Sequence, residues 1–363
     1  MYRKLLLISI VSLSLFSCDP TATDPISNFT NGVLVLNAGN FTDNNGTISS
    51  FQRNSTTPVN DIFQYSNGRT LAGGISGYAE ALNNTRGIIL VDNATAGKDV
   101  IEIVDANTFK SIATIPSTEI ENPRVVLKVS DSKTYISCWG ATGDFSNFFK
   151  NPGYIAVLDL NTNKITKKIP VQNGAESMVL VGTDVYVGSE DYKQTTMALI
   201  DSKTDALTKN IPIGSSKLIG VDLNNILWLV SDGVILKYNI LTGKQENKFR
   251  VETTIKDASP RSFAMSADKK TIYYTNSYYD KNFTEIGQTY SFPVNTTKIE
   301  ANTPFIKRLF GGGFGVDPVS GLIYAAAIPS YKQAGYVYRY TTAGVLKDSI
   351  KVGIAPSGFY FKK

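Results

Sequence analysis

Short stretches of alternating apolar and polar residues fill the chain from residue 31 to residue 363, and they recur in a constant order. One alternating stretch leads into a polar turn of the form Asp-x-x-Thr, and a second stretch follows that ends near Ile-Pro. Alternation with a period of two predicts β-strands with one buried face. The turn recurs at intervals between 38 and 54 residues, with Asp105, Asp159 and Asp201 in the clear copies and Gln52, Asn239, Pro293 and Thr341 in the weaker ones.

Each repeat also contains a second unit, in which two alternating strands flank a tight polar turn. Four strands in roughly 40 to 50 residues are typical of one propeller blade. The pattern therefore predicts an all-β fold, a seven-bladed β-propeller over residues 31–363. Residues 32–36 resemble the second strand of a blade without its first, and residues 357–361 resemble a first strand. We expect the C-terminal strand to pair into the N-terminal blade, which closes the ring and removes the open sheet edge.

The beginning of the chain has the pattern of a targeting segment. A short basic start precedes an apolar run over residues 5–16, which is too short to cross a bilayer and fits a signal peptide. The run ends in Leu-Phe-Ser-Cys at residues 15–18, which resembles the bacterial lipobox. We therefore expect residues 1–17 to be a lipoprotein signal peptide, and residues 18–30 to be the lipidated Cys18 with a flexible tether.

Composition removes several classes of function. The 363 residues include no His, which excludes Ser-His and Cys-His nucleophile pairs and the commonest metal ligand. The two cysteines cannot form a structural zinc site or a disulfide framework, and we expect Cys138 to be a buried free thiol. The net charge of +5 is too small to indicate a nucleic-acid partner. We expect no metal, no other cofactor and no enzymatic activity.

Candidate ligand-binding residues lie in loops of one propeller face. The loops that enter the first strand of each blade share this face with the loops between second and third strands, so their residues converge over the central channel. Three cations against one anion at the entry positions predict a mildly positive channel mouth, which favours phosphate, carboxylate or catecholate oxygens. Solvated loop charges are the alternative interpretation. The entry positions are Ser76, Arg124, Glu176, Lys217, Arg261, Gly313 and Ser357.

Aromatic residues are frequent in the loops between second and third strands. One such loop is the tight turn over residues 231–233, so the longer aromatic loops exceed what the fold requires. Aromatic side chains supply a large contact area at low cost in conformational entropy, which suits flat, partly apolar ligands. The alternative is that some of them fold back as small satellite cores. The candidates in these loops are Asn40, Phe41, Trp139, Phe148, Phe149, Tyr192, Tyr278, Tyr279 and Tyr331.

The repeat resembles that of a known propeller family. The tetrapeptide Tyr-Tyr-Thr-Asn at residues 273–276 is close to the Tyr-Val-Thr-Asn repeat of YncE-like and surface-layer propellers, and the Ile-Asp-x-x-Thr units match its second half. Acidic residues follow Cys18 at Asp19 and Asp24, as in the surface-export signal of Bacteroidota lipoproteins. The chain thus resembles the propeller lipoproteins of Bacteroidota, which include BtuG-type cobalamin-binding surface proteins. This resemblance implies a protein that is lipid-anchored in the outer membrane and faces the cell surface.

The same resemblance implies a function in nutrient uptake. Such a protein binds a small, bulky nutrient on one propeller face and hands it to a TonB-dependent outer-membrane transporter. Cobalamin or another corrinoid, or a ferric siderophore, would be a cargo of this kind. Two alternatives stay open. A protein-interaction or adhesion platform predicts a broad apolar patch, and a propeller enzyme, a lyase or a quinoprotein-type oxidoreductase, would use a base such as Glu176 or Lys217.

Overall fold

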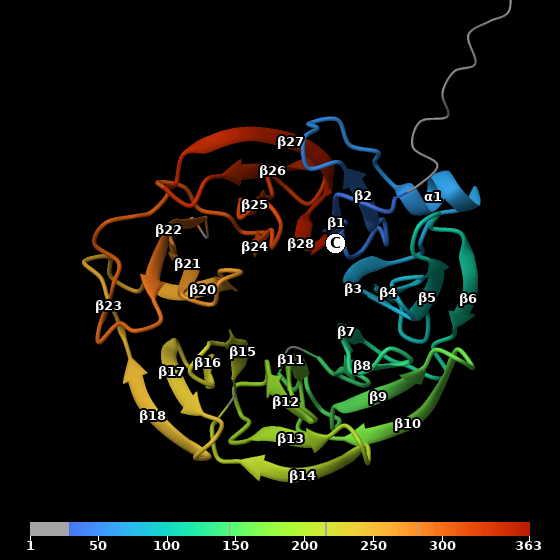
Figure 1. Ribbon diagram of the computed structural model, residues 1–363, viewed down its shortest axis with the longest axis horizontal. Helices are drawn as coiled ribbons and strands as arrows, with labels where there is room; N and C mark the ends of the chain where they lie inside the picture. Colours follow the sequence, from blue (N-terminus) through green and yellow to red (C-terminus); the bar gives the residue numbers. More distant parts are fainter. Residues whose placement is uncertain (1–28, 145, 215, 283) are drawn as a thin grey trace, which may run out of the picture.

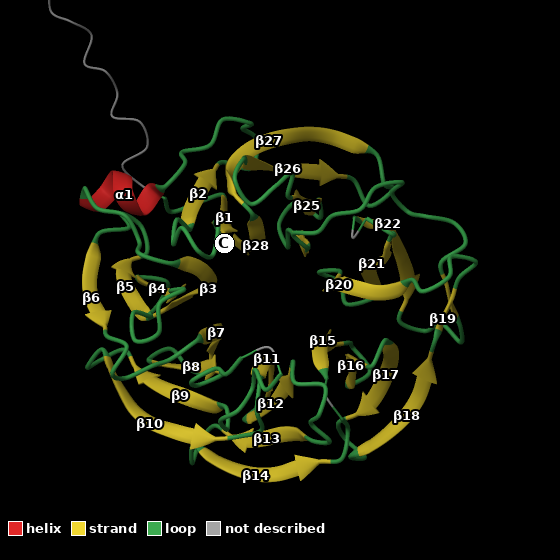
Figure 2. Cartoon of the chain, turned by 180° about the vertical axis from the view of Figure 1, so that it is seen from behind, coloured by secondary structure: helices red, strands yellow, loops and turns green. Residues whose placement is uncertain are grey.

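Seven antiparallel sheets stand around a central channel in the computed structural model, which describes residues 29–144, 146–214, 216–282 and 284–363 (Figure 1). Each sheet is one blade of the ring, and its first strand lies next to the channel while later strands lie progressively further out. The view from behind shows the same order of strands in the blades (Figure 2). The predicted all-β, seven-bladed propeller is therefore confirmed.

Five of the described blades contain four strands each, and their order in each sheet follows the chain. They are β3 (Gly74–Ala81), β4 (Arg86–Asp92), β5 (Val100–Asp105) and β6 (Ser111–Ile115); β7 (Pro123–Lys128), β8 (Lys133–Cys138), β9 (Tyr154–Asp159) and β10 (Lys164–Pro170); β11 (Ala175–Val181), β12 (Asp184–Ser189), β13 (Met197–Asp201) and β14 (Ala206–Ile211); β15 (Lys217–Val221), β16 (Ile226–Ser231), β17 (Val234–Asn239) and β18 (Lys244–Phe249); and β24 (Phe314–Val316), β25 (Ile323–Ala327), β26 (Ala334–Tyr340) and β27 (Leu346–Ile354).

The remaining two blades have three strands each among the described residues. One consists of β28 (Pro356–Phe361), β1 (Val33–Asn37) and β2 (Thr47–Phe51), and the other of β20 (Ser259–Met265), β21 (Thr271–Tyr279) and β22 (Glu285–Pro293). Two short strands, β19 (Val251–Glu252) and β23 (Ile299–Glu300), pair in parallel. The helix α1 (Ile62–Asn67) lies on the outside of the ring (Figure 1). No helix of the described segments has the length and apolar character needed to cross a membrane.

Apolar side chains fill the space between neighbouring blades. Ile88 and Leu90 of β4 pack with Ile136 of β8 and Leu158 of β9, and all four are fully buried. Burying a side chain of this size contributes roughly 1.5–3 kcal/mol. Cys138 belongs to the same layer and is a free, buried thiol, as predicted. Its burial raises the pKa of the thiol to about 12.

The recurrent turn aspartates have a structural role. The Asp105 carboxylate accepts hydrogen bonds from the backbone N–H groups of Asn107 and Thr108, at 3.0 and 2.9 Å. Asp159 and Asp201 accept equivalent bonds at the turns between their own strands. A carboxylate that bonds local backbone amides in this way stabilises a hairpin turn. These residues therefore explain the sequence repeat without belonging to a functional site.

The C-terminal strand closes the ring. Strand β28 pairs antiparallel with β1, with Val33 opposite Phe361 and Val35 opposite Phe359. The first strand of the N-terminal blade thus comes from the other end of the chain, as the sequence predicts. Because β1 is paired on both sides, it presents no free edge for another chain.

Buried ion pairs join the strands that meet where the ring closes. The Lys362 ammonium lies 2.8 Å from Glu80 of β3, and each side chain is only 3% exposed. Lys362 Nζ also donates a hydrogen bond to the carbonyl oxygen of Ala106. On the other side of the closing blade, Arg53, which follows β2, binds Asp317 of the next blade at 2.8 Å and donates to the carbonyl oxygen of Lys362. These contacts tie the last residues of the chain to the blades on either side.

The predicted signal peptide, the lipidation site Cys18 and most of the tether lie outside the described residues. The described chain begins at Phe29, whose ring is buried and packs edge-on against Phe109 at a centroid distance of 5.6 Å. The Phe29 N–H donates a hydrogen bond to the Asn107 carbonyl oxygen. Packing against the propeller therefore starts slightly before residue 31.

Candidate functional site

Bulges at the start of the innermost strands point side chains toward the channel mouth. The register of β3 shifts between Ile75 and Gly77, which leaves Ser76 unpaired, and the register of β7 shifts in the same way around Arg124. Similar shifts leave Glu176 of β11 and Ser357 of β28 unpaired. A bulge bends a strand and redirects a side chain. Four predicted entry positions are thus held at one face by the same irregularity.

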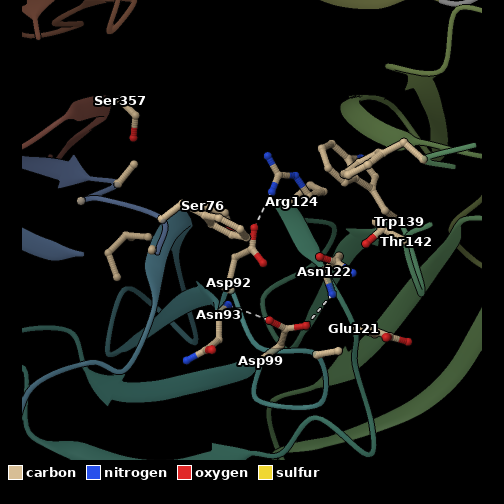
Figure 3. A pocket seen from close by; sticks show the side chains of 18 of the residues that line it. Ser76, Asp92, Asn93, Asp99, Glu121, Asn122, Arg124, Trp139, Thr142 and Ser357 are labelled. Carbon is tan, nitrogen blue, oxygen red and sulfur yellow. Dashed lines mark hydrogen bonds and ion pairs between the residues drawn. The ribbon is translucent and has the colours of Figure 1, made fainter. Parts of the chain in front are cut away.

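A cavity of about 600 Å³ opens on this face, over β28, β3 and β7 (Figure 3). Its volume lies in the usual range for small-molecule sites. Predicted residues and residues that the sequence analysis did not select both line it. The predicted ones are Phe41, Ser76, Arg124, Trp139, Phe148, Tyr331 and Ser357, and the others include Asp92, Asn93, Asp99, Glu121, Asn122 and Thr142.

Arg124 occupies the centre of a charged cluster in this cavity. Its Nη1 donates to Asp92 Oδ2 at 2.7 Å, and its Nε donates to Glu176 Oε2 at 3.2 Å. The guanidinium carbon lies 4.0 Å from the ring centroid of Trp139, within cation–π distance. Figure 3 shows the Arg124 side chain between Asp92 and Trp139. Three different partners therefore hold Arg124 in one orientation.

Asp92 is the most perturbed group that lines the cavity. Burial raises the pKa of its carboxyl group from 3.8 to about 6, although Arg124 beside it acts in the opposite direction. Its Oδ1 atom is buried and accepts no hydrogen bond from a described residue, and the Asp99 carboxyl group beside Asp92 raises the pKa further. Burial also raises the pKa of Glu176, again against the effect of Arg124. The single positive charge of Arg124 thus does not offset the effect of burial on the pKa of these two carboxyl groups.

Asp99 builds the floor of the cavity. Its two carboxylate oxygens accept hydrogen bonds from the backbone N–H groups of Asn93, at 2.7 Å, and Asn122, at 2.8 Å. The Asn122 side chain in turn donates to the carbonyl oxygen of Gly140 at 2.7 Å. These bonds link the loop after β4 to the loops before β7 and after β8. Asp99 therefore positions Asn93, Asn122 and the loop that carries Trp139.

The aromatic residues of the loop after β8 form a small cluster of their own. Trp139, Phe148 and Phe149 meet edge to face, with centroid distances from 5.0 to 5.6 Å. Arg124 lies over the Trp139 ring, so packing within the protein already uses much of this surface. This loop therefore folds back as a small satellite core, which was the alternative interpretation of the aromatic loops. By contrast, Phe41 and Tyr331 are 55% and 60% exposed at the cavity rim.

A second cavity of about 480 Å³ lies on the same face, over the start of β15 and of β20, between the loop after β12 and the segment before β24. Lys217 and Glu190 form an ion pair at 3.4 Å on its wall. Arg261 lies 5.4 Å from the ring centroid of Tyr279. Tyr331 lines both cavities. Three further predicted residues, Lys217, Arg261 and Tyr279, therefore gather at this second cavity.

Some predicted residues line neither cavity. Asn40 accepts hydrogen bonds from Thr42 and Asp43 within its own loop, which makes it a turn residue. Tyr192 is 75% exposed, and Tyr278 pairs with Ile286 in the sheet. Phe149 packs against the Trp139 ring, and Glu176 forms an ion pair with Arg124. Gly313 precedes β24 with a positive φ of 86°.

The predicted positive channel mouth is absent around the first cavity. Asp92, Asp99 and Glu121 line it together with one base, Arg124, which Glu176 also contacts. Asp92 and Asp99 were missed because only aromatic residues and strand-entry residues were selected from the sequence. Asp92 is the last residue of β4 and Asp99 lies in the loop that follows, which joins a second to a third strand, so their place in the repeat was the available signal. The described chain contains no cluster of three or more His, Cys, Asp or Glu side chains placed to hold a metal ion.

Comparisons with known proteins support the fold. A family model described as DUF5074, a domain of unknown function, matches residues 31–362. No curated protein matches the chain. The chain is similar to a quinonprotein alcohol dehydrogenase-like protein from Bacteroides thetaiotaomicron, with 15% identity, a TM-score of 0.64, and coverage of 93% of this chain and 79% of that chain.

Two further solved structures share the architecture. A periplasmic gluconolactonase from Pseudomonas aeruginosa has 13% identity and a TM-score of 0.59, with 91% of this chain and 99% of that chain covered. A functionally unknown protein from Desulfotomaculum acetoxidans has 12% identity and a TM-score of 0.61, with 91% and 98% covered. Identities this low show the fold and carry no residue roles.

These comparisons correct the expectation that the protein is not an enzyme. The gluconolactonase is an enzyme on the same scaffold, so the fold gives no reason to exclude catalysis. The lack of His was also too weak an argument, because carboxylates serve as general acids and bases when their pKa is shifted. Asp92, which the sequence analysis did not select, is such a carboxylate.

Proposed function

This chain belongs to the family described as DUF5074, a domain of unknown function, and we propose from its cavity that the protein captures a small polar ligand beside Arg124. The observation that carries the proposal is the buried Asp92 Oδ1, which accepts no hydrogen bond from a described donor and has another carboxyl group, that of Asp99, beside it. A buried acceptor costs free energy unless a donor reaches it. A hydroxyl, amide or amine group of a ligand would supply this donor.

The charges of the cavity indicate which ligands it accepts. Three acids line it against the single base Arg124, and that base is bound to Asp92 and Glu176. A phosphate, carboxylate or catecholate would meet uncompensated negative charge, which repels it. The end of the ligand that enters the cavity is therefore uncharged or cationic. This argues against the ferric siderophore and in favour of donor-rich cargo.

We extend the proposal to the place where the protein works. A lipid on Cys18 would anchor it in the outer membrane, and it would pass its ligand to a TonB-dependent transporter. The support comes from the sequence: the predicted signal peptide at residues 1–17, the tether, and the resemblance to YncE-like propellers and BtuG-type cobalamin-binding proteins. An amide-bearing corrinoid is compatible with the surplus of acceptors. The concave cavity supports ligand capture over an adhesion platform.

Calorimetric titration tests ligand capture. The protein from residue 19 onward, which keeps every described residue, is titrated with cobinamide, cobalamin and maltohexaose. We expect one probe to bind with a micromolar or lower Kd. Asp92→Leu removes the unpartnered acceptor at similar volume, so it weakens binding by about tenfold or more. The matched control is Tyr65→Ala, an exposed residue of α1 that lines neither cavity. No binding by any probe, or equal binding by both variants, contradicts the proposal.

Acid–base catalysis in the same cavity is a second candidate function. The observation that favours it is the Asp92 pKa of about 6, which suits a general base near neutral pH. In the hydrolysis of a sugar lactone, the Asp92 carboxylate would accept a proton from the water that attacks the carbonyl carbon. The ring C–O bond then breaks, and the protonated Asp92 returns the proton to the leaving oxygen, which becomes a hydroxyl group of the open acid. Hydrolysis of glucono-δ-lactone, followed by pH-stat, tests this. We expect Asp92→Asn to abolish the protein-dependent rate, and a rate equal to the spontaneous one for the unmodified protein would rule the candidate out.

A further inference from the structure

We propose that the two cavities form one extended site, and that its ligand is a neutral oligosaccharide lying across the channel mouth. The inference rests on the proposed capture function and names the ligand class for it. The two cavities open on the same propeller face, and Tyr331 lines both of them. Their volumes are about 600 and 480 Å³. A ligand long enough to occupy both cavities would therefore contact Tyr331 where it passes from one to the other.

Both parts of the site are polar, and carboxylates outnumber cations in each. Arg124 is bound by Asp92 and Glu176 in the first cavity; in the second, Glu190, Asp232 and Glu285 face Lys217, which is bound by Glu190, and Arg261. An anionic ligand would meet this surplus of negative charge, at a cost in free energy. The acidic groups still offer acceptor atoms to ligand hydroxyls. A polar ligand without net charge fits both cavities.

Exposed aromatic rings stand beside the polar groups of both cavities. Phe41 is at the rim of the first cavity, Tyr279 is 54% exposed at the second, and Tyr331 lies between them. A pyranose ring has an apolar face of C–H groups and an edge of hydroxyl groups. The apolar face can lie on an aromatic ring while the hydroxyl groups bond to nearby carboxylates and amides. Repeated aromatic and polar groups in two connected cavities therefore fit a chain of sugar units.

The experiment compares short and long neutral sugars. The protein from residue 19 onward is titrated by calorimetry with maltose and maltohexaose, and with cellobiose and cellohexaose. In one linkage series we expect the hexasaccharide to bind about tenfold or more tighter than the disaccharide, because only it reaches both cavities. Tyr279→Ala should weaken binding of the hexasaccharide by about tenfold and leave binding of the disaccharide unchanged. Phe41→Ala should weaken binding of both sugars, and Tyr65→Ala should change the affinity for neither.

Each other outcome overturns the inference in a recognisable way. Equal affinities for the two lengths, with no effect of Tyr279→Ala, would show that the first cavity acts alone. Binding of cobinamide or cobalamin without any of the sugars would show a different ligand class. In both cases the proposed capture function survives. If no sugar and no corrinoid binds, the inference and the proposed function fail together.

Discussion

Removing the ammonium of Lys362 should destabilise the closed ring strongly. In Lys362→Met the chain keeps a long, apolar side chain, but Glu80 loses the partner that lies 2.8 Å from it. Glu80 is 5% exposed, and of its remaining contacts the Tyr78 hydroxyl donates to it at 2.8 Å. Breaking a buried ion pair by removing one partner costs about 3–5 kcal/mol, because an uncompensated charge stays buried. We expect a loss of that size.

Urea denaturation at pH 7 measures this loss, and a double-mutant cycle assigns it to the pair. Glu80→Gln removes the charge but keeps an acceptor for the Tyr78 hydroxyl. The double variant Lys362→Met/Glu80→Gln should therefore be more stable than Lys362→Met alone, with a coupling energy of roughly 1–3 kcal/mol. A free energy of unfolding for Lys362→Met within about 1 kcal/mol of the unmodified protein would refute the reasoning, since that is the range of an exposed ion pair.

Three further predictions follow from other parts of the ring. Deleting residues 356–363 removes β28 and opens the edge of β1, so we expect faster proteolysis and self-association in size-exclusion chromatography; a monomeric, protease-resistant product would contradict the closure argument. Because burial raises the pKa of Cys138 to about 12, its thiol should not react with a disulfide reagent at pH 8 until urea unfolds the protein, and rapid reaction of the folded protein would show that the thiol is accessible. Burial raises the pKa of Asp92 to about 6, above its value in the unfolded chain, so this carboxyl group destabilises the fold as pH rises between about 4 and 6. Asp92→Asn should accordingly gain more stability relative to the unmodified protein at pH 8 than at pH 4, by up to about 3 kcal/mol, and a gain independent of pH would disprove the shifted pKa.

Some site residues could be predicted from their place in the repeat. Arg124 was found because it enters the first strand of a blade, and Phe41 and Tyr331 were found because they are aromatic residues in loops between second and third strands. What these residues contact could not be predicted. The carboxylates of Asp92 and Glu176 come from two other blades, and they neutralise the cation that the entry positions indicated.

Two other features of the site, the aromatic loop around Trp139 and the role of Asp99, also depend on contacts between residues that are far apart in the sequence. The aromatic loop around Trp139 looked available for a ligand, but Phe148 and Phe149 pack against its ring and Arg124 lies over it. The local sequence does not distinguish an aromatic ring that is free to contact a ligand from one that other side chains of the protein already cover. The position of Asp99 in a loop between second and third strands was visible in the sequence, but its bonds to backbone groups of two different loops were not.

The architecture of this protein could be predicted from local features of its amino-acid sequence. Strand alternation, the turn aspartates and the two incomplete ends predicted seven blades and the pairing of β28 with β1, because those features act over a few residues or repeat along the chain. The electrostatics and the shape of the site could not be predicted in this way. The pKa of Asp92, the pairing of Arg124 and the placement of Tyr331 beside two cavities all depend on side chains from several blades, which only the closed ring brings within a few ångströms of one another.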